Sequence, residues 1–430
     1  MASPNDQSDS DDREKRMSPR PRLSPREAAV WTVTRLQQAG FAAYFAGGCV
    51  RDQLMGREPT DYDVATSARP EEIQRIFPRA RAVGESFGVM LVRHGGQTVE
   101  VATFRTDGPY SDGRHPDEVH FTDAEHDAQR RDFTINGLFE DPVAGRIIDF
   151  VGGQRDLKAR CIRAIGDAHE RLREDRLRML RAVRFAARFA FSIDPETADA
   201  IREGAGNLKG ISRERIGQEI RRMMMNANRA VAAWELQYLG LDELVLGESN
   251  RTVAPTRLGQ LPEPAAYPTA LAAWVFDRHG EGTEADRAAR RWRKALMLSN
   301  TEYDTLRDCL DYSRALRSAW PRLGVARQKR IAASAPFEQA LLLVQTADRQ
   351  EFIDIRRRVL ELEKTGLAPE PLISGEDLIG AGMKPGPRFR RILDGVYDAQ
   401  LEGQIGSREE ALDLAVLIGR TIGASGGKGG

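Results

Sequence analysis

Residues 46–66 read AGGCVRDQLMGREPTDYDVAT, and this stretch decides how the first part of the chain folds. The adjacent glycines Gly47 and Gly48 precede an Arg-Asp pair, and two aspartates, Asp61 and Asp63, follow with one residue between them. Glycine lets the backbone approach a phosphate closely, and the N-terminus of a helix attracts an anion. The stretch therefore predicts a strand, a Gly-Gly turn and a helix, and then a strand that carries two carboxylates.

The two aspartates suit the binding of metal ions. On a strand, residues i and i+2 point to the same face, roughly 6–7 Å apart, so Asp61 and Asp63 project side by side. Such a pair can hold one or two Mg²⁺ ions, which would bridge triphosphate oxygens and lower the pKa of an attacking hydroxyl. Glu100 alternates with Val99 and Val101 in a second predicted strand, and it would complete a metal-binding trio if it shares that face. An ordinary solvent-facing position is the alternative for each acid.

Composition limits the class of protein. The chain has 430 residues, enough for two to four domains, with 30% charged and 41% hydrophobic residues. No apolar run approaches ~18 residues, so we expect no membrane span. The first 23 residues are rich in Pro, Ser and Asp and lack an apolar signal segment, and they are predicted to be disordered. The three cysteines form no CxxC pair, which fits a reducing, cytoplasmic compartment.

The charge balance limits the partners. The 64 basic and 64 acidic residues cancel, which argues against a protein that coats nucleic acid but leaves room for a local basic patch. Residues 171–189, RLREDRLRMLRAVRFAARF, form such a patch of arginines. A solvated helix face with salt bridges to neighbouring glutamates is the alternative for these arginines.

The secondary-structure pattern changes along the chain. A helix over 24–39 opens with a capping box and a proline at its first position. Short segments broken by Gly and Pro predict a β-rich region with interspersed helices over 40–150, and the pattern is helical from residue 155 on. A loop is expected over 247–268, and residues 364–375 are expected to mark another boundary. The sequence therefore predicts an α/β head followed by an all-α remainder.

Five motifs occur in a fixed order between residues 44 and 220. They are GG-x-VRD, D-x-D, RRDFTINGL (130–138), EDRLRMLRAVRF (174–185) and RERIGQEI (213–220). In this order they resemble the tRNA nucleotidyltransferase/poly(A) polymerase family of the polymerase-β-like nucleotidyltransferase superfamily, which includes the bacterial CCA-adding enzymes. Gly137 departs from the alanine that the family usually has, and we expect little effect.

The resemblance implies a fold and a set of domains. A polymerase-β-like nucleotidyltransferase head of the α/β class would be followed by an all-α neck, body and tail. The expected division is a disordered segment at 1–23, a head at 24–155, a neck at 156–228, a body at 229–365 and a tail at 366–424 that contacts tRNA.

The resemblance also implies roles for individual residues. Asp61 and Asp63 match the metal-binding aspartates, and Glu100 is the third candidate catalytic acid. Within the nucleotide site, Arg131 matches an arginine that contacts the triphosphate, and Asp132 and Asn136 are expected near the sugar. The full set of expected nucleotide-binding residues is Gly48, Arg51, Arg131, Asp132, Asn136, Asp175, Arg178, Arg181 and Arg184. The last motif is expected to brace the neck through Arg213, Arg215 and Glu219.

Asp175 and Arg178 suggest how bases would be chosen. At i and i+3 they would be neighbours on one helix face. A carboxylate accepts a hydrogen bond from an exocyclic amino group, and a guanidinium donates to a ring nitrogen. Cytosine and adenine both present these two groups, whereas uracil and guanine present a carbonyl and a ring N–H. One Asp-Arg pair would thus accept CTP and ATP and reject UTP and GTP.

Three features indicate the kind of family member. The zero net charge favours the CCA-adding type over a poly(A) polymerase. Residues 106–123 resemble the flexible loop of enzymes that add the terminal adenosine. Residues 371–403 resemble the tail of bacterial CCA-adding enzymes, where Lys384 or Arg388 could contact RNA phosphate, with a simple packing motif as the alternative.

The expected function is the addition of C, C and A from CTP and ATP to the 3′ end of tRNA. It would use Mg²⁺ in the cytoplasm, without a membrane or an obligate protein partner. An A-adding enzyme, a poly(A) polymerase and a non-catalytic RNA-binding protein on this fold remain the alternatives.

Overall fold

The computed structural model describes residues 22–83, 88–108 and 118–425. The predicted disordered segment 1–23, apart from its last two residues, and the middle of the predicted flexible loop 106–123 lie outside the described residues. The chain forms two compact units. The first runs to Glu219 and includes Tyr238–Val245, and the second comprises Ile220–Gln237 and the chain from Leu246 onward. The finer division into head, neck, body and tail stays a prediction.

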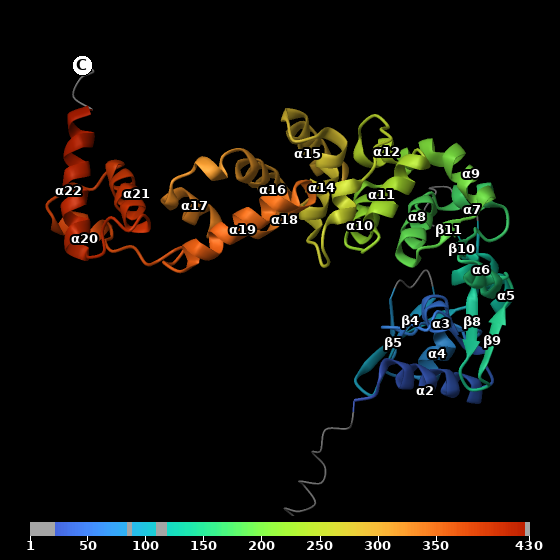
Figure 1. Ribbon diagram of the computed structural model, residues 1–430. Coiled ribbons are helices and arrows are strands. Elements are labelled where there is room, and N and C mark those ends of the chain that lie inside the picture. The colour runs from blue at the N-terminus through green and yellow to red at the C-terminus, as the bar shows by residue number, and fades with distance from the viewer. Residues whose placement is uncertain (1–21, 84–87, 109–117, 426–430) are drawn as a thin grey trace, which may run out of the picture. The chain divides into compact units, whose positions relative to one another are not determined.

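A mixed sheet forms the centre of the first unit (Figure 1). Its strand order is β3-β4-β5-β2-β1-β8-β9, with β2 and β5 parallel and the other neighbours antiparallel. The strands are β1 (Ala43–Ala46), β2 (Val64–Thr66), β3 (Arg81–Ala82), β4 (Val89–His94), β5 (Gln97–Thr103), β8 (Leu138–Asp141) and β9 (Arg146–Asp149). Two small pairs accompany the sheet, namely β6 (Arg105–Asp107) with β7 (Val119–Phe121), and β10 (Cys161–Ile162) with β11 (Ser192–Ile193).

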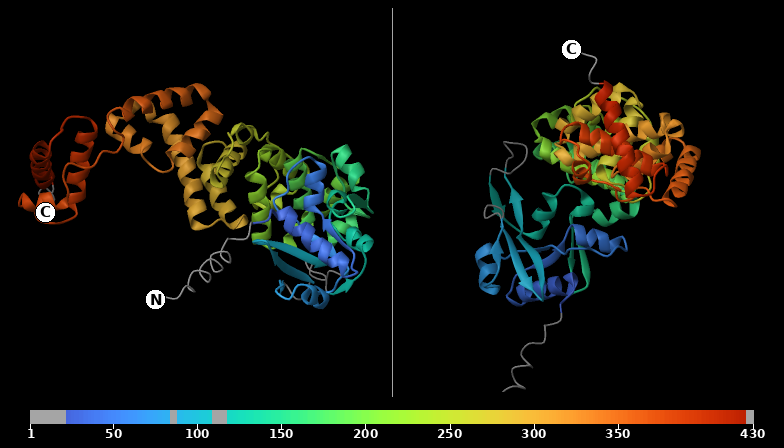
Figure 2. Two further views of the ribbon diagram at one scale, coloured as in Figure 1. Left: turned by 90° about the horizontal axis from the view of Figure 1, so that it is seen from below. Right: turned by 90° about the vertical axis from the view of Figure 1, so that its left-hand side faces the viewer.

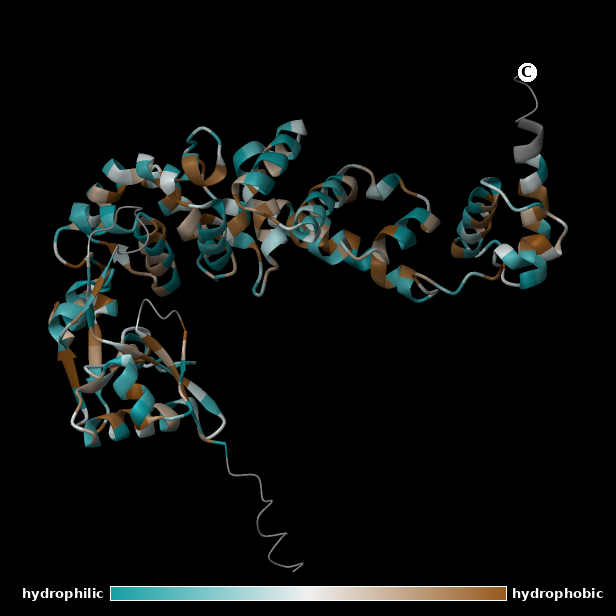
Figure 3. Ribbon diagram, turned by 180° about the vertical axis from the view of Figure 1, so that it is seen from behind, coloured by the Kyte–Doolittle hydropathy of each residue, from teal (hydrophilic) through white to brown (hydrophobic). Residues whose placement is uncertain are grey.

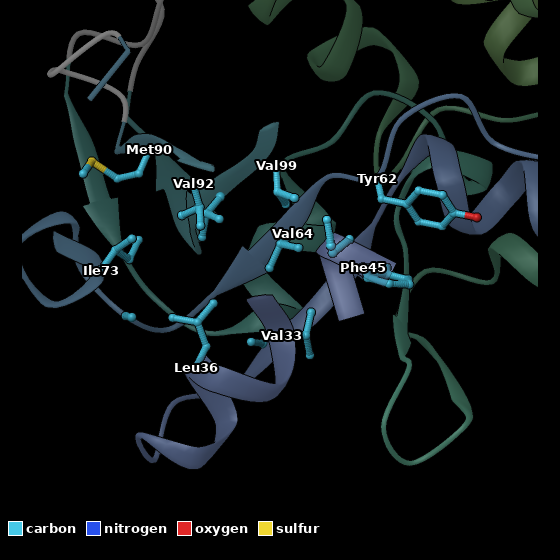
Figure 4. Close-up of a cluster of buried hydrophobic side chains, with 14 of the residues drawn as sticks. Val33, Leu36, Phe45, Tyr62, Val64, Ile73, Met90, Val92 and Val99 are labelled. Atoms are coloured by element: carbon cyan, nitrogen blue, oxygen red, sulfur yellow. The ribbon is translucent and has the colours of Figure 1, made fainter. Parts of the chain in front are cut away.

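Apolar side chains cover the two faces of this sheet differently. Helix α2 (Pro25–Gln38), which starts with the predicted capping box, packs on one face together with α4 (Pro70–Ile76) (Figure 2). Leu36, Phe45 and Val64 belong to the core on that face (Figure 4). A smaller cluster around Ala46, Ala65, Phe104 and Phe139 covers the other face. The polar side chains described below lie at the edge of this second face.

Helices complete the first unit. They are α3 (Gly48–Leu54), α5 (Ala124–Gln129), η2 (Thr134–Asn136), α6 (Gly153–Ala159), α7 (Ala168–Glu174), α8 (Arg178–Phe189), α9 (Pro195–Gly204), η3 (Ala205–Gly210) and α12 (Asp242–Leu246). Helix α10 (Arg213–Met224) runs across the boundary between the units. The prediction that Asp175 and Arg178 share one helix face is wrong, because α7 ends at Glu174 and α8 begins at Arg178. Asp175 is extended, and its carboxylate accepts a hydrogen bond from the Leu177 amide at 3.0 Å, which stops α7.

The described part of the second unit is helical, as predicted. Its helices are α11 (Arg229–Tyr238), α13 (Thr256–Gln260), α14 (Tyr267–His279), α15 (Thr283–Ala295), α16 (Asn300–Ser318), η4 (Trp320–Arg322), α17 (Val325–Ala332), α18 (Phe337–Ala347), α19 (Arg349–Glu363), α20 (Gly375–Gly380), α21 (Arg388–Leu401) and α22 (Arg408–Ser425). The short α13 lies inside the segment 247–268 that was expected to be a loop. Residues 364–374 form an irregular connection between α19 and α20. Hydrophilic and hydrophobic residues alternate along the helices (Figure 3), and none in the described ranges is long and apolar enough to cross a membrane.

Candidate active site

Asp61 and Asp63 lie in an extended segment that leads into β2. They were expected within the strand itself, but β2 begins at Val64. The alternation still holds, because Tyr62 is buried against the ring of Phe45 at a centroid distance of 5.1 Å while the two aspartates are exposed. The amide of Ala46 donates to the Asp63 carbonyl at 2.9 Å and fixes this segment beside β1. The two carboxylates therefore point away from the main core.

The parallel pairing of β2 with β5 brings Glu100 to the same place. Val64 pairs with Val101, so the residues one step earlier, Asp63 and Glu100, are adjacent and share a face. Partial burial, followed by the charges of Glu100 and then Asp61, raises the pKa of Asp63 to about 6, although Arg131 opposes this shift. The charges of Glu100 and Asp61 thus act on Asp63 in the same direction as its burial.

These carboxylates fit a divalent cation, although they are not already assembled around a metal position. Across the described ranges, no three His, Cys, Asp or Glu side chains are already drawn together as a preformed metal site. Carboxylate oxygens are the ligands that Mg²⁺ prefers, and mutual repulsion among carboxylates is relieved when a cation binds. The residues present therefore match the predicted metal-binding role of Asp61 and Asp63, with Glu100 adjacent.

The Gly-Gly turn places Arg131 beside these acids. Gly47 has a φ of +67°, and a Cβ atom there would lie 2.7 Å from Arg131 Nη1. Arg131 donates to Asp127 at 3.0 Å and to the Asn136 carbonyl at 3.2 Å, so its guanidinium is held in position. Gly48 starts α3, and a Cβ atom there would make only an ordinary 3.8 Å contact with Arg51. The close approach that requires a glycine thus lies at Gly47, and the nucleotide contact of Gly48 stays a prediction.

Replacing Gly47 with alanine is expected to lower the kcat/KM of nucleotide incorporation by tenfold or more. The new methyl group would strain a positive-φ residue by roughly 1 kcal/mol and displace the Arg131 guanidinium. Gly48→Ala is the matched control and should lose much less. Steady-state kinetics of the two variants provide the measurement, and equal losses would contradict the importance of the close approach at Gly47.

Arg51 is buried and already paired. Its guanidinium lies 2.7 Å from Asp52 and donates to Asn136 Oδ1 at 2.5 Å. It also stacks over the Phe189 ring at 4.6 Å. Burial lowers the pKa of Arg51, and Asp52 counteracts that effect. Asp52 thus holds the Arg51 side chain, and Arg51 connects α3 to Asn136 and to Phe189 of α8.

Asp132 and Asn136 join the sheet region to α8. The Asp132 carboxylate accepts hydrogen bonds from Arg181 at 2.6 and 2.8 Å and from Asn136 at 2.9 Å. Burial alone would raise the pKa of Asp132, but the charge of Arg181 and these hydrogen bonds outweigh it and lower the pKa to about 2. Asp132 and Asn136, the two residues expected near the sugar, are therefore part of a buried polar network.

Asp132→Asn is expected to reduce the free energy of unfolding by about 2 kcal/mol at pH 7. The folded-state pKa of Asp132 lies below its ordinary value, so the stabilisation is present above about pH 4 and is lost as the pH falls toward 2. Urea denaturation at pH 7 and at pH 3 tests this, because the difference between variant and wild type should shrink at the lower pH. A constant difference would mean that ionisation of Asp132 contributes nothing.

The predicted neck residues make separate ion pairs. Asp175 pairs with Arg215 at 3.0 Å, whereas Arg178 donates to Glu174 and, at 2.8 Å, to the Arg171 carbonyl. Arg184 donates to Glu219 at 2.6 Å, and Arg213 donates to the Leu244 carbonyl. Arg215 and Glu219 thus contact the segment 174–185, in line with the bracing prediction, whereas Arg213 bonds to Leu244 outside the predicted neck. The side chains of Asp175 and Arg178 thus pair with different partners and would have to reorient to read one base together.

Sequence reasoning missed Asp127. This buried residue on α5 accepts hydrogen bonds from both Arg130 and Arg131, and these two arginines hold its pKa below the ordinary value against the effect of burial. Asp127 precedes Arg130 by three residues and Arg131 by four, and this spacing could have predicted that they pair on one helix face.

Comparisons with known proteins agree with this arrangement. The family model described as the poly A polymerase head domain matches residues 43–163. A second model, described as the probable RNA and SrmB-binding site of polymerase A, matches residues 190–248. The two matches therefore cover the sheet with its acidic edge and part of the helical region that follows.

Full-length relatives are also found. The CCA-adding enzyme of Geobacillus stearothermophilus is 34% identical over 398 residues, which are 90% of this chain and 96% of that protein. The CCA-adding enzyme of Geobacillus thermodenitrificans is 36% identical over 403 residues, with 90% and 96% covered. The crystal structure of the Bacillus stearothermophilus CCA-adding enzyme in complex with CTP superposes with a TM-score of 0.76 at 30% identity, covering 94% of this chain and all of that one. The chain belongs to the CCA-adding enzyme family of nucleotidyltransferases.

Proposed function

We propose that this protein adds C, C and A in turn to the 3′ end of tRNA, using CTP and ATP and releasing pyrophosphate. The observation that carries the proposal is the strand register that sets Asp63 beside Glu100, with Asp61 two residues before Asp63, near an arginine that is held against a glycine turn. The relatives named as CCA-adding enzymes span nearly the same length, which supports this choice over an A-adding enzyme or a poly(A) polymerase.

In the proposed reaction, Asp61 and Asp63 would hold Mg²⁺. The bound ions would neutralise the triphosphate and make the terminal hydroxyl of the RNA a better nucleophile. Glu100 lies next to Asp63 and would keep the local charge negative enough to attract a cation. Arg131 faces the same region and is rigidly held, so its guanidinium would bind the triphosphate oxygens with little loss of side-chain freedom.

The base would be read in the turn between α7 and α8. Asp175 supplies a carboxylate acceptor and Arg178 supplies guanidinium donors, which together match cytosine and adenine and mismatch uracil and guanine. Both side chains are engaged elsewhere in the structure, Asp175 with Arg215 and Arg178 with Glu174. Nucleotide binding would therefore exchange these ion pairs for contacts with the base. Arg181 would hold the helix in place through Asp132.

The proposed setting is the cytoplasm. Cys49, Cys161 and Cys309 are all free thiols, and Cys49 and Cys309 are buried. Burial raises the pKa of Cys49 and of Cys309 to about 12, so both remain protonated and unreactive. This use of cysteine is consistent with a reducing compartment.

Pyrophosphate release tests the chemistry. Purified protein with CTP and a tRNA that lacks its last three nucleotides should release one pyrophosphate for each cytidine incorporated. A chelator should stop both processes together, and added Mg²⁺ should restore them. Incorporation that continues in excess chelator, or incorporation without pyrophosphate, would contradict the proposed metal-dependent nucleotidyl transfer.

A further inference from the structure

A small cavity lies behind the turn that carries Asp175, between α7, α8 and α9. Its volume is about 200 Å³, below the ~300 Å³ at which pockets for drug-sized ligands begin, so it suits a small ion. Leu172, Met179 and Ala200 supply apolar surface, and Arg173 and Arg176 supply positive charge. Arg176 lies in the same turn as Asp175, but none of these residues is one of the proposed metal-binding or base-reading residues.

Arg176 is held in this cavity with one donor unused. Its Nη1 donates weakly to the Asn207 carbonyl at 3.4 Å, while its buried Nε has no hydrogen-bond acceptor among the residues that the structure describes. A buried guanidinium N–H without an acceptor is costly, and an anion would satisfy it. Gly210 makes room for this side chain, because a Cβ atom there would lie only 2.4 Å from Arg176 Nη1.

The charge of the cavity wall favours an anion. Arg173 is exposed, and no carboxylate in the described ranges pairs with it. The acid in the wall is Glu203, a largely exposed residue whose Oε2 lies 3.6 Å from His169 Nδ1. Two guanidinium groups thus face one peripheral carboxylate. A single guanidinium can bind a phosphate through two parallel hydrogen bonds, and two arginines line this cavity.

We propose that Arg173 and Arg176 form a phosphate-binding site separate from the nucleotide site. The ligand is a phosphate oxyanion, either a phosphodiester of bound RNA or free inorganic phosphate. The RNA source rests on the proposed function, whereas the binding of inorganic phosphate does not. Arg176 directly follows Asp175, so an RNA phosphate bound here anchors the substrate next to the base-reading turn.

The variants Arg173→Gln and Arg176→Gln test the site, with Lys209→Gln as the matched control. Lys209 is an exposed cation on the neighbouring η3 that does not line the cavity. Gly210→Ala offers a second test, because it displaces the Arg176 guanidinium and leaves the charge unchanged. The melting temperature of each variant without phosphate shows whether it is folded.

Two measurements distinguish the sources of phosphate. Inorganic phosphate should raise the melting temperature of the wild type and of Lys209→Gln more than acetate does at equal ionic strength, and this increase should be lost in the arginine variants and in Gly210→Ala. If RNA supplies the phosphate, each arginine variant should also bind tRNA about five- to tenfold more weakly, with a salt slope smaller by about one. Its KM for tRNA should rise with little change in kcat or in the choice between CTP and ATP.

The outcomes are clear-cut. A lost phosphate effect with unchanged tRNA affinity would support the site and assign it to free phosphate. The proposal is overturned if the arginine variants keep both the phosphate effect and the tRNA affinity of the wild type. It is also overturned if their phosphate effect and tRNA affinity fall no further than those of Lys209→Gln. A wild type that binds phosphate but no tRNA would instead refute the proposed function and leave the site standing.

Discussion

Asp63→Asn is expected to abolish nucleotide incorporation while making the metal-free protein no less stable. Loss of a metal-binding carboxylate removes several kcal/mol of transition-state stabilisation, so kcat should fall by at least a hundredfold. Burial and the charges of Glu100 and Asp61 raise the pKa of Asp63 to about 6, so the ionised carboxylate is unfavourable in the folded protein. The folded state holds this proton more tightly than the unfolded chain does. Stability therefore falls as the pH rises from about 4 to 6.

The neutral asparagine removes the repulsion between Asp63 and the charges of Glu100 and Asp61. The melting temperature of the Asp63→Asn variant at pH 7.5 without metal should therefore be higher than that of the wild type. Glu58→Gln is the matched control, because Glu58 is an exposed acid on the same connecting segment, and it should keep its activity. Incorporation kinetics and thermal unfolding measure the two effects. A tenfold loss of turnover corresponds to only ~1.4 kcal/mol of activation free energy. If Asp63→Asn keeps more than about a tenth of wild-type turnover, Asp63 does not hold the catalytic metal.

Asp175→Ala is expected to relax the choice of base and to slow incorporation of CTP and ATP. The substitution removes the acceptor that repels the O4 carbonyl of uracil and that pairs with the amino groups of cytosine and adenine. Discrimination against UTP should fall by roughly 1–3 kcal/mol, or about 5- to 150-fold. The Arg215 guanidinium also loses its partner at 3.0 Å, so some loss of stability is expected as well.

Two comparisons separate base reading from structural damage. Asp199→Ala removes an exposed acid that pairs only with Arg202 on α9, and it should leave selectivity unchanged. Arg181→Ala breaks the contact with Asp132 and should slow all four nucleotides alike. The measurement is kcat/KM for CTP, ATP, UTP and GTP. If Asp175→Ala slows every nucleotide by the same factor, this residue positions the neck, and the base is chosen elsewhere.

Local patterns in the sequence predicted much of the sheet. The alternating segments gave β1, β4, β5 and β9 close to their observed positions, and the capping box at Ser24 gave α2. The strand β8, which lies between β1 and β9, was missed because its four residues follow a glycine and show no alternation of polar and apolar residues. All four of its residues are buried, including Glu140 and Asp141, so no polar-apolar alternation could mark it.

The errors at the neck have a different cause. The segment around Asp175 consists of good helix formers, so its local propensity predicts one continuous helix. The break depends on the Asp175 side chain bonding to the Leu177 amide and on Arg215, forty residues later, pairing with the same carboxylate. Likewise, the sequence could not show that Arg51, an expected nucleotide-binding residue, is buried against Phe189, because that burial follows from tertiary packing. The residue types of the candidate site were predictable, whereas their partners were not.

The most direct test of the central claim is to determine the 3′-terminal sequence made by the purified protein. A tRNA that ends at the nucleotide before the CCA position is incubated with Mg²⁺ and all four nucleoside triphosphates, and its 3′ ends are then sequenced. The proposed function predicts that C, C and A are added in that order and that extension then stops. Three results would contradict it. They are the addition of a single adenosine only to tRNA that already ends in CC, the addition of a run of adenosines, and no extension at all.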